Sequence, residues 1–270
     1  MIATSRSPLR PTLGFVERNW ALTRRYLGWE VVWLVYGVIN TLTIGLIGVD
    51  SQGIVGQQRV FYLLIGALLW TYLSVLFQII AETVAWERWE GTIEYTFMAP
   101  VSRLTFLAGQ GLYGVTYALV RTVVILAVTV LWFHLDVSNA NLLGGFVVLA
   151  VASISFLGLG LLAAVLPLMS PERGPQATHI IQGLLLLCSS VYYPITVLPG
   201  WLRPAAALNP ATYALDAVRA TWMGGASLTT VWPMVLKLLV TGVLLVPVGL
   251  LVFQAGERYA LRTGKLKRNG

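Results

Sequence analysis

Long runs of apolar residues, separated by short polar segments, dominate the chain. Three runs hold no charged residue, and each exceeds the roughly 18 residues that cross a bilayer as a helix: they cover residues 31–49, 60–81 and 142–169. Three further runs, at 104–135, from near Gln176 and from near Val231, contain a charge or prolines. The pattern predicts an all-α integral membrane protein with six transmembrane helices.

The run at 104–135 is too long for one simple crossing. At about 1.5 Å of rise per residue, a helix of this length would exceed a hydrocarbon core of roughly 30 Å by half. We therefore expect its first turns, with Gly109 and Gly111, to lie along the membrane interface and the third span to cover about 113–133. The last span is expected at about 231–255, with a kink at Pro247.

Arg121 lies near the middle of the third span, where a charge costs about 2.5 kcal/mol or more. It should therefore face a protein interior or a water-filled cavity and have a partner. Two roles stay open for it: a structural contact with neighbouring carbonyl groups, and a place on a transport path. Its candidate partners are the polar residues Glu82, Gln78 and Gln182.

Mixed and basic segments flank the apolar runs. Residues 11–30 combine aromatic side chains with Arg18, Arg24 and Arg25, which is typical of a helix that lies in the membrane interface. We divide the chain into a tail and amphipathic interface helix, a six-span domain and a basic tail, at residues 1–30, 31–255 and 256–270. No signal peptide is expected, because the first thirty residues carry arginines and no leading apolar core.

The distribution of charge indicates how the chain is oriented in the membrane. Charged residues make up 11% of the 270 residues, against roughly a quarter in soluble domains. With the N-terminus inside the cell, 13 of the 18 Lys and Arg residues fall on inner segments and three on outer segments. This asymmetry follows the positive-inside rule. We expect a multi-pass protein of the cytoplasmic (inner) membrane, with both termini cytoplasmic and no nucleic-acid partner.

Charges cluster between two long apolar runs at residues 86–103, WERWEGTIEYTFMAPVSR. The sequence suits a short amphipathic element with one polar face. Pro100 ends this element, because proline lacks the N–H that a helix requires. The charge distribution places the segment in the cytoplasm, where it can contact a partner outside the membrane.

Residues 192–225 are too interrupted to cross a bilayer and too apolar for a free loop. Short re-entrant or interface helices fit this composition, because irregular backbone is not tolerated against lipid. Asn209 and Pro210 would cap and start one of these helices, with Asp216 and Arg219 on one face of it. The aromatic residues of the region fit an interfacial belt or, less often, a gate: they are Tyr192, Tyr193, Trp201, Tyr213 and Trp222.

No motif for catalysis or ATP binding is found. The sequence lacks a GxxxxGK[ST] phosphate loop and the GxSxG and HExxH motifs. His134 and His179 lie far apart and without carboxylates at metal-ligand spacing. The chain is therefore not expected to be an enzyme or to bind a cofactor or metal itself.

Two segments in the same order resemble the ABC-2 family of ABC transporter permeases. WERWEGTIEYTFMAPVSR resembles that family's ExExGTLE…PVSR segment after the second span. SSVYYPITVLPGWLRPAAALNPATYALDAVR resembles the second signature, in which Tyr-Pro and Leu-Pro lead to Asn-Pro-x-Thr-Tyr and Asp-x-x-Arg. Together with the predicted spans, the resemblance covers nearly the whole chain, and it is specific to the family but not to a substrate.

The resemblance implies roles for particular residues. The segment after span two would be a coupling helix of about 86–103, which docks on an ATP-binding subunit through Glu87, Arg88, Glu90, Gly91, Thr92, Ile93, Glu94 and Pro100. The outer re-entrant helices would include Tyr193, Pro194, Leu198, Pro199, Asn209, Pro210, Tyr213, Asp216 and Arg219. Residues 11–30 would be the family's connecting helix.

The resemblance also implies partners and a mechanism. The chain would pair with a second copy, or a close relative, and with separate ABC ATPase subunits that bind ATP and Mg²⁺. Alternating access would move an amphipathic drug, a lipid or a lipid-linked glycan outward. Four aromatic residues could line a conduit for a glycan, but we favour their interpretation as packing or belt residues: Trp33, Tyr36, Trp70 and Tyr72. A secondary transporter, or a membrane scaffold or sensor, is the alternative from the residues alone.

Overall fold

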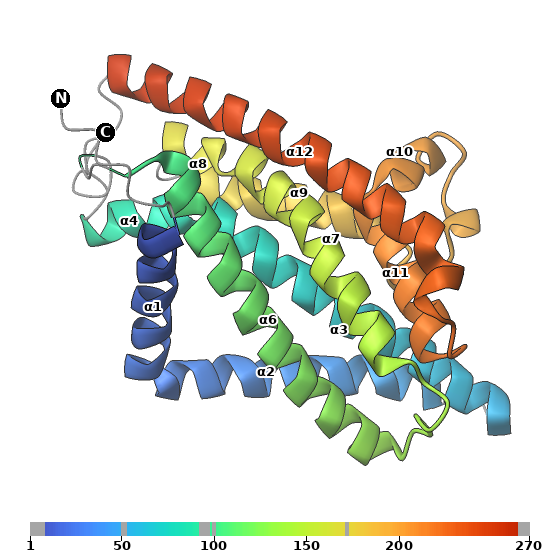
Figure 1. Cartoon of the computed structure of the whole chain (residues 1–270). Helices are drawn as coiled ribbons and strands as arrows, with labels where there is room; N and C mark the ends of the chain where they lie inside the picture. The colour runs from blue at the N-terminus through green and yellow to red at the C-terminus, as the bar shows by residue number, and fades with distance from the viewer. Residues whose placement is uncertain (1–8, 50–52, 92–97, 99–100, 171–172, 264–270) are drawn as a thin grey trace.

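The computed structural model describes residues 9–49, 53–91, 98, 101–170 and 173–263. All regular elements within these residues are helical (Figure 1). They are α1 (Leu9–Arg25), α2 (Leu27–Val49), α3 (Gly53–Ala81), α4 (Thr83–Glu90), α6 (Arg103–Phe133), α7 (Leu142–Ala163), α8 (Val165–Met169), α9 (Gly174–Leu187), η1 (Ile195–Val197), α10 (Arg203–Leu208), α11 (Pro210–Trp222) and α12 (Leu228–Arg262).

Five helical segments of the described chain are long and apolar enough to cross a membrane. They correspond to the predicted spans one to four and to the last span: Leu27–Val49, Gln57–Ala81, Arg103–Phe133, Leu142–Met169 and Leu228–Arg262. The all-helical, multi-span class is therefore confirmed. The exact count of six is not, because the predicted fifth span differs.

That fifth span is the short helix α9, which has 14 residues. At about 1.5 Å per residue it reaches only about 21 Å, less than a hydrocarbon core of roughly 30 Å. Its end has a local cause. The hydroxyl of Ser189 donates to the carbonyl of Leu186 at 2.6 Å, a side-chain bond that competes with continued helix. Pro194 then has no backbone N–H to donate, so the helix cannot resume through it.

Helix α6 is a single element of 31 residues, so the first turns that we expect at the interface are continuous with the third span. Ser102 caps it by accepting the N–H of Thr105. Helix α1 covers these first turns, with the rings of Phe15 and Phe106 edge to face at 5.2 Å. A Cβ at Gly109 would come within 2.6 Å of Phe15, so the glycine permits the close approach of α1.

Helix α3 is the centre of the bundle. In its most apolar window 67% of the residues are buried, against 22% for α2 and for α12. It packs against α2, α6, α7 and α11. Tyr72 on α3 is 1% exposed, and its hydroxyl lies 2.6 Å from that of Ser153 on α7. Tyr72 is therefore a packing residue, as the favoured interpretation of the aromatics has it.

Helix α12 extends beyond the predicted last span at both ends. It runs without interruption over Pro233 and Pro247 and lies along α7 (Figure 1). The ammonium of Lys237 lies 4.9 Å from the ring centroid of Tyr213 on α11. This cation–π contact joins the predicted last span to the outer region.

Trp222 belongs to the core rather than to the expected aromatic belt. It is 2% exposed, its ring packs on Phe146 with 5.5 Å between centroids, and its indole N–H donates to the carbonyl of Leu142 at 3.3 Å. The reason is Gly145 on α7: a Cβ there would lie 1.8 Å from the indole nitrogen. The absence of a side chain lets the large ring enter between α7 and α11.

We expect Gly145→Ala to destabilise the protein by about 1–3 kcal/mol, the usual cost of overpacking a core. Thermal unfolding of the purified protein in detergent measures this loss. Gly14→Ala is the matched control, since Gly14 is also helical but has nothing within 4 Å of the position that an added methyl group would take. An equal melting temperature for Gly145→Ala and the wild type would contradict this packing.

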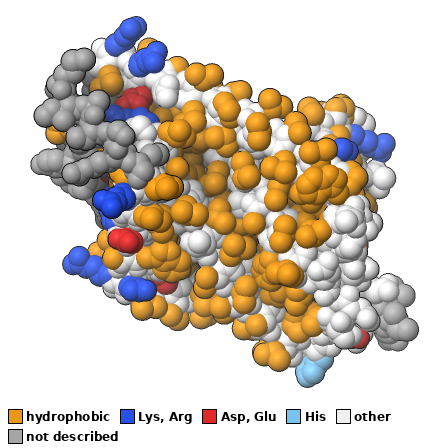
Figure 2. All heavy atoms as spheres, in the orientation of Figure 1, with side chains coloured by type: hydrophobic (Ala, Val, Ile, Leu, Met, Phe, Trp, Pro, Cys, Tyr) orange, Lys and Arg blue, Asp and Glu red, His pale blue; other side chains and the backbone are white. Residues whose placement is uncertain are grey.

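Charged side chains gather at one end of the molecule, near α1, α4 and the C-terminal end of α12 (Figures 1 and 2). The face in Figure 2 is otherwise mostly apolar across its middle. Exposed apolar side chains of this kind include Val123 on α6 at 50% and Leu244 on α12 at 61%. Such a surface suits a multi-pass membrane protein, where lipid covers the apolar band.

Candidate functional site

Helix α1 is fastened along the first half of α6. The amide of Asn19 donates to the side-chain oxygen of Gln110 at 2.7 Å. Four residues later the hydroxyls of Thr23 and Tyr113 lie 2.7 Å apart, and the rings of Trp20 and Tyr113 meet edge to face at 5.7 Å. One face of α1 is therefore held by polar and aromatic contacts together.

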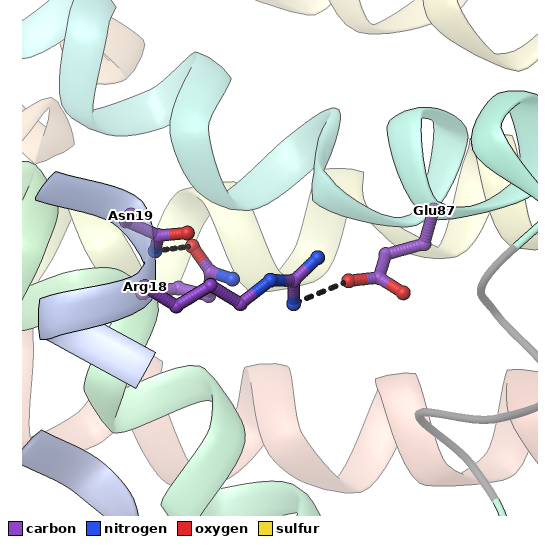
Figure 3. Close-up of polar contacts among 4 residues, drawn as sticks. Arg18, Asn19 and Glu87 are labelled. Atoms are coloured by element: carbon purple, nitrogen blue, oxygen red, sulfur yellow. Dashed lines mark hydrogen bonds and ion pairs between the residues drawn. The ribbon is translucent and has the colours of Figure 1, made fainter. Parts of the chain in front are cut away.

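An ion pair joins α1 to α4 (Figure 3). The guanidinium of Arg18 lies 3.2 Å from Oε1 of Glu87. The Glu87 side chain is 8% exposed, whereas that of Arg18 is 40% exposed. A carboxylate buried to this degree needs a charged or hydrogen-bonding partner, so Arg18 stabilises the position of α4.

A second ion pair holds the chain where α6 begins. Arg103 contacts Oε1 of Glu257 on α12 through Nε and Nη2, each at 2.9 Å. Glu257 is 8% exposed. The predicted coupling helix, residues 86–103, is therefore anchored near its start to α1 and at its end to α12.

The structure describes only part of that predicted coupling helix. Helix α4 ends at Glu90, and Gly91 follows with φ +74°, a left-handed conformation that favours glycine at the end of a helix. Glu87 is buried and paired. The remaining docking predictions lie outside the described residues or side chains and stay predictions: they concern Arg88, Glu90, Thr92, Ile93, Glu94 and Pro100.

A polar cavity of about 630 Å³ lies beside these contacts. Its walls come from α1, α2, α3, α4, α6 and α9. Ionisable residues from five of these helices and from the α3–α4 junction line it: Arg18, Glu30, Glu82, Glu87, Arg121 and His179. We call this space the polar cavity. Its volume lies within the range of ligand-binding pockets.

The polar cavity brings three of the four predicted transport-path residues together. Gln78, Glu82 and Arg121 line it, and Gln182 reaches it through Gln78, whose amide donates to its side-chain oxygen at 3.1 Å. The predicted partners of Arg121 are wrong, however. Among the described contacts its guanidinium donates to the backbone carbonyl of Trp33, which is the structural alternative left open for this residue.

Glu82 lies at the junction of α3 and α4. Nε2 of His179 on α9 is 3.5 Å from its Oε1, and that oxygen is buried without a hydrogen-bond partner among the described residues. Burial raises the pKa of the Glu82 carboxyl above its ordinary value, and the nearby His179 opposes part of this rise. Glu82 is thus a desolvated carboxyl group on the wall of a cavity.

The predicted re-entrant region folds as η1, α10 and α11 at the end opposite α1 (Figure 1). Asn209 caps α11 as predicted: its side-chain oxygen accepts the N–H of Ala211, and its amide donates to the carbonyls of Leu185 and Cys188. Pro210 is the first residue of α11. The cap therefore also ties α11 to the end of α9.

The predicted gate residues serve mainly as internal ties of this region. The hydroxyl of Tyr193 donates to the carbonyl of Leu187 at 2.7 Å, and that of Tyr213 donates to the carbonyl of Ala207. Pro194 and Leu198 bracket η1, and Leu198 is 5% exposed. Tyr192 and Pro194 line a second, outer cavity of about 600 Å³, whereas Pro199 starts a turn to Leu202.

Asp216 and Arg219 are three residues apart on α11 and close enough to interact electrostatically, but they differ in exposure. Asp216 is exposed, while Arg219 is 8% exposed. The guanidinium of Arg219 lies 3.5 Å from the ring centroid of Tyr62. It also donates to three backbone carbonyls, those of Ser190, Val191 and Tyr62. Arg219 therefore fastens α11 to α3 and to the chain after α9.

A family model described as the ABC-2 type transporter matches residues 17–223. The match includes both segments that resemble the family, the one at 86–103 and the one that ends at Arg219. The chain belongs to the ABC-2 type transporter family. The resemblance seen in the sequence is confirmed.

The chain is distantly similar to proteins named as ABC transporter permeases. The probable multidrug ABC transporter permease YbhR of Escherichia coli K12 is 23% identical over 158 residues, which cover 58% of this chain and 42% of YbhR. The probable doxorubicin resistance ABC transporter permease protein DrrC of Mycobacterium tuberculosis H37Rv is 26% identical over 145 residues, 53% of this chain and 51% of DrrC. The chain spans about half the length of these relatives.

Several residues of this ABC-2 site carried no motif in the sequence. Arg18, Asn19 and Glu257 are ordinary charged or polar residues near the ends of apolar runs. Gln110 had a usable signal, because it is a polar residue between Gly109 and Gly111 in an otherwise apolar run. That pattern indicates a close helix contact with a hydrogen bond across it.

Proposed function

We propose that this chain is the permease subunit of an ATP-driven ABC exporter, with the polar cavity on its transport path. One observation carries the proposal. The helix that leads into the predicted ATPase-docking segment, α4, is itself a wall of the cavity, through Thr83, Trp86 and Glu87. A movement imposed on this segment therefore changes the cavity directly.

The docking partner in this proposal is a separate ABC ATPase subunit, which holds ATP and Mg²⁺. The coupling helix at 86–103 contacts it through the glutamates and the Gly-Thr-Ile sequence that resemble the family's motif. Charge at this end of the molecule supports such a contact (Figure 2). Trp86, which is 57% exposed, can then anchor the helix to the membrane surface or to the partner.

Transport requires a second permease copy, identical or closely related, beside the first. The long apolar faces of α2, which include Val32 at 55% exposed and Ile39 at 57%, are suited to lipid or to this second copy. ATP-driven closure of the ATPase pair moves the two coupling helices, and the shared path opens outward. The ion pairs Arg18–Glu87 and Arg103–Glu257 transmit the movement to α1 and α12.

The favoured direction of transport is export, and the favoured cargo is an amphipathic drug, a lipid or a lipid-linked glycan. The relatives whose printed names concern multidrug transport and doxorubicin resistance support a drug. The asymmetry of Lys and Arg residues supports an inner-membrane location with both termini in the cytoplasm. In that orientation the polar cavity lies toward the cytoplasm, where an exporter takes up its cargo.

Charge reversal in the coupling helix tests the ATPase contact. We expect Glu90→Lys combined with Glu94→Lys to abolish co-purification of the partner ABC ATPase subunit and to uncouple its ATP hydrolysis from cargo. Glu17→Lys, on the exposed side of α1, is the matched control and should leave both intact. If the ATPase still binds and its hydrolysis stays coupled after both reversals, residues 86–103 are not the docking site.

A further inference from the structure

The charges on the wall of the polar cavity do not balance. Three carboxylates, Glu30, Glu82 and Glu87, face two guanidinium groups, Arg18 and Arg121. Arg18 and Glu87 form an ion pair at 3.2 Å. Glu30 accepts a hydrogen bond from the hydroxyl of Tyr117. Among the described side chains, Glu82 is the carboxylate of this wall whose nearest ionisable partner is the histidine His179, at 3.5 Å.

The only cation-forming group within 4 Å of Glu82 in the described part of the chain is His179. The His179 side chain is 57% exposed, whereas that of Glu82 is 24% exposed. An imidazole so open to solvent is easily displaced, because an exposed pair contributes little. Glu82 therefore offers a desolvated negative charge that a ligand cation can approach from the cavity.

Aromatic rings complete the environment that a cation would meet. Tyr113 and Tyr117 stack on α6 with 5.7 Å between centroids, and both line the cavity with Trp33 and Trp86. Aromatic faces attract cations through their quadrupole and at the same time bury apolar groups. A carboxylate beside such rings suits an organic cation with an apolar body better than an inorganic ion, which would need several oxygen ligands.

We propose that the polar cavity binds amphipathic organic cations, with Glu82 as the counter-ion and the aromatic residues of α2 and α6 as the apolar wall. This inference rests on the proposed transport path and names the chemical class of its cargo. The volume of about 630 Å³ fits a molecule of drug size. The cavity lies beside α4, so occupation by a cation would bear on the helix that leads to the ATPase.

Two probes of equal shape and opposite charge test the proposal: tetraphenylphosphonium, a cation, and tetraphenylborate, an anion. Equilibrium dialysis with the full-length chain in nanodiscs measures the binding of each. We expect the cation to bind with saturation, and Glu82→Gln to weaken its binding about thirtyfold or more, the loss that follows when one partner of a buried charge pair is removed. His179→Ala should strengthen binding of the cation, because it removes the group that competes for Glu82.

The matched control is Glu17→Gln, which removes one negative charge from an exposed position of α1 outside the cavity. It should leave binding unchanged, and thermal unfolding should show that all variants remain folded. Equal binding of both probes to the wild type, or an unchanged affinity in Glu82→Gln, would overturn the cation site. The ATPase co-purification test needs no cargo. Failure of the cation site would therefore not contradict the assignment of the chain as a permease subunit.

Discussion

Arg219→Met is expected to lower the free energy of unfolding by about 3 kcal/mol or more and to loosen the whole outer region. Arg219 donates to the carbonyls of Ser190, Val191 and Tyr62. Each buried carbonyl that loses its donor costs about 1–3 kcal/mol. Methionine keeps most of the length of the side chain, so the loss measures the hydrogen bonds and the cation–π contact rather than a cavity.

Other side chains cannot easily replace Arg219, because its surroundings are closely packed. A Cβ at Gly66 on α3 would lie 2.2 Å from the carbonyl oxygen of Val191 and 3.1 Å from the guanidinium, so α3 passes close to this contact. We expect Arg219→Lys to restore little, because an ammonium cannot donate to separate carbonyls from a planar fork.

Arg203→Met is the matched control. Arg203 also donates to two loop carbonyls, those of Leu198 and Thr196, but it is exposed. Water can replace it, so we expect a loss within about 0.5 kcal/mol. Thermal unfolding in detergent, with limited proteolysis of residues 192–225, compares the two variants. Equal losses for Arg203→Met and Arg219→Met would mean that burial of Arg219 does not stabilise the fold.

The spans were predictable because they depend on local composition. A continuous apolar run of sufficient length forms a helix in lipid whatever lies elsewhere in the chain, and four of the predicted spans and the last one follow this rule. The length of the fifth helix was overestimated. The apolar sequence continues beyond Leu187, but the hydroxyl of Ser189 bonds to the carbonyl of Leu186 and prolines follow. Hydropathy alone does not register these local effects.

The two segments that resemble the family identified the family, but they did not predict the contacts that hold these segments in the fold. Arg18 and Glu87 are 69 residues apart, and Arg103 and Glu257 are 154 apart. No periodicity within a helix links such residues. Arg121 illustrates the same limit: its place on the wall of a cavity was predictable from the cost of charge in the bilayer, whereas its partner among the described residues is a backbone carbonyl, which has no signature in a sequence.

Exchange of the charges at Arg18 and Glu87 is expected to distinguish an effect on cargo-stimulated ATP hydrolysis from an effect on folding. Arg18→Glu alone places two carboxylates where an ion pair of 3.2 Å now lies. The buried Glu87 then loses this partner, which costs about 1–3 kcal/mol. We expect α4 to shift away from α1 and the cargo-stimulated ATP hydrolysis of the complex to fall about tenfold, equal to about 1.4 kcal/mol of coupling free energy.

Glu87→Arg alone should produce the same loss, because two guanidinium groups would then face each other. The double variant Arg18→Glu with Glu87→Arg restores opposite charges in reversed order, and we expect it to recover at least half of the stimulation. Such a recovery isolates the pairwise interaction from the effect of either residue alone. Arg24→Glu, which reverses an exposed charge on the last turn of α1, should be neutral.

The pattern across these four variants discriminates between two roles of the contact. If α1 only anchors the chain to the membrane surface, the single reversals lower protein abundance and leave the stimulation per molecule unchanged. If α1 transmits the movement of α4, abundance stays near that of the wild type and the stimulation falls. Glu87 lines the polar cavity as well as pairing with Arg18, so the second result would join the ATPase-docking helix to the cargo path through one side chain.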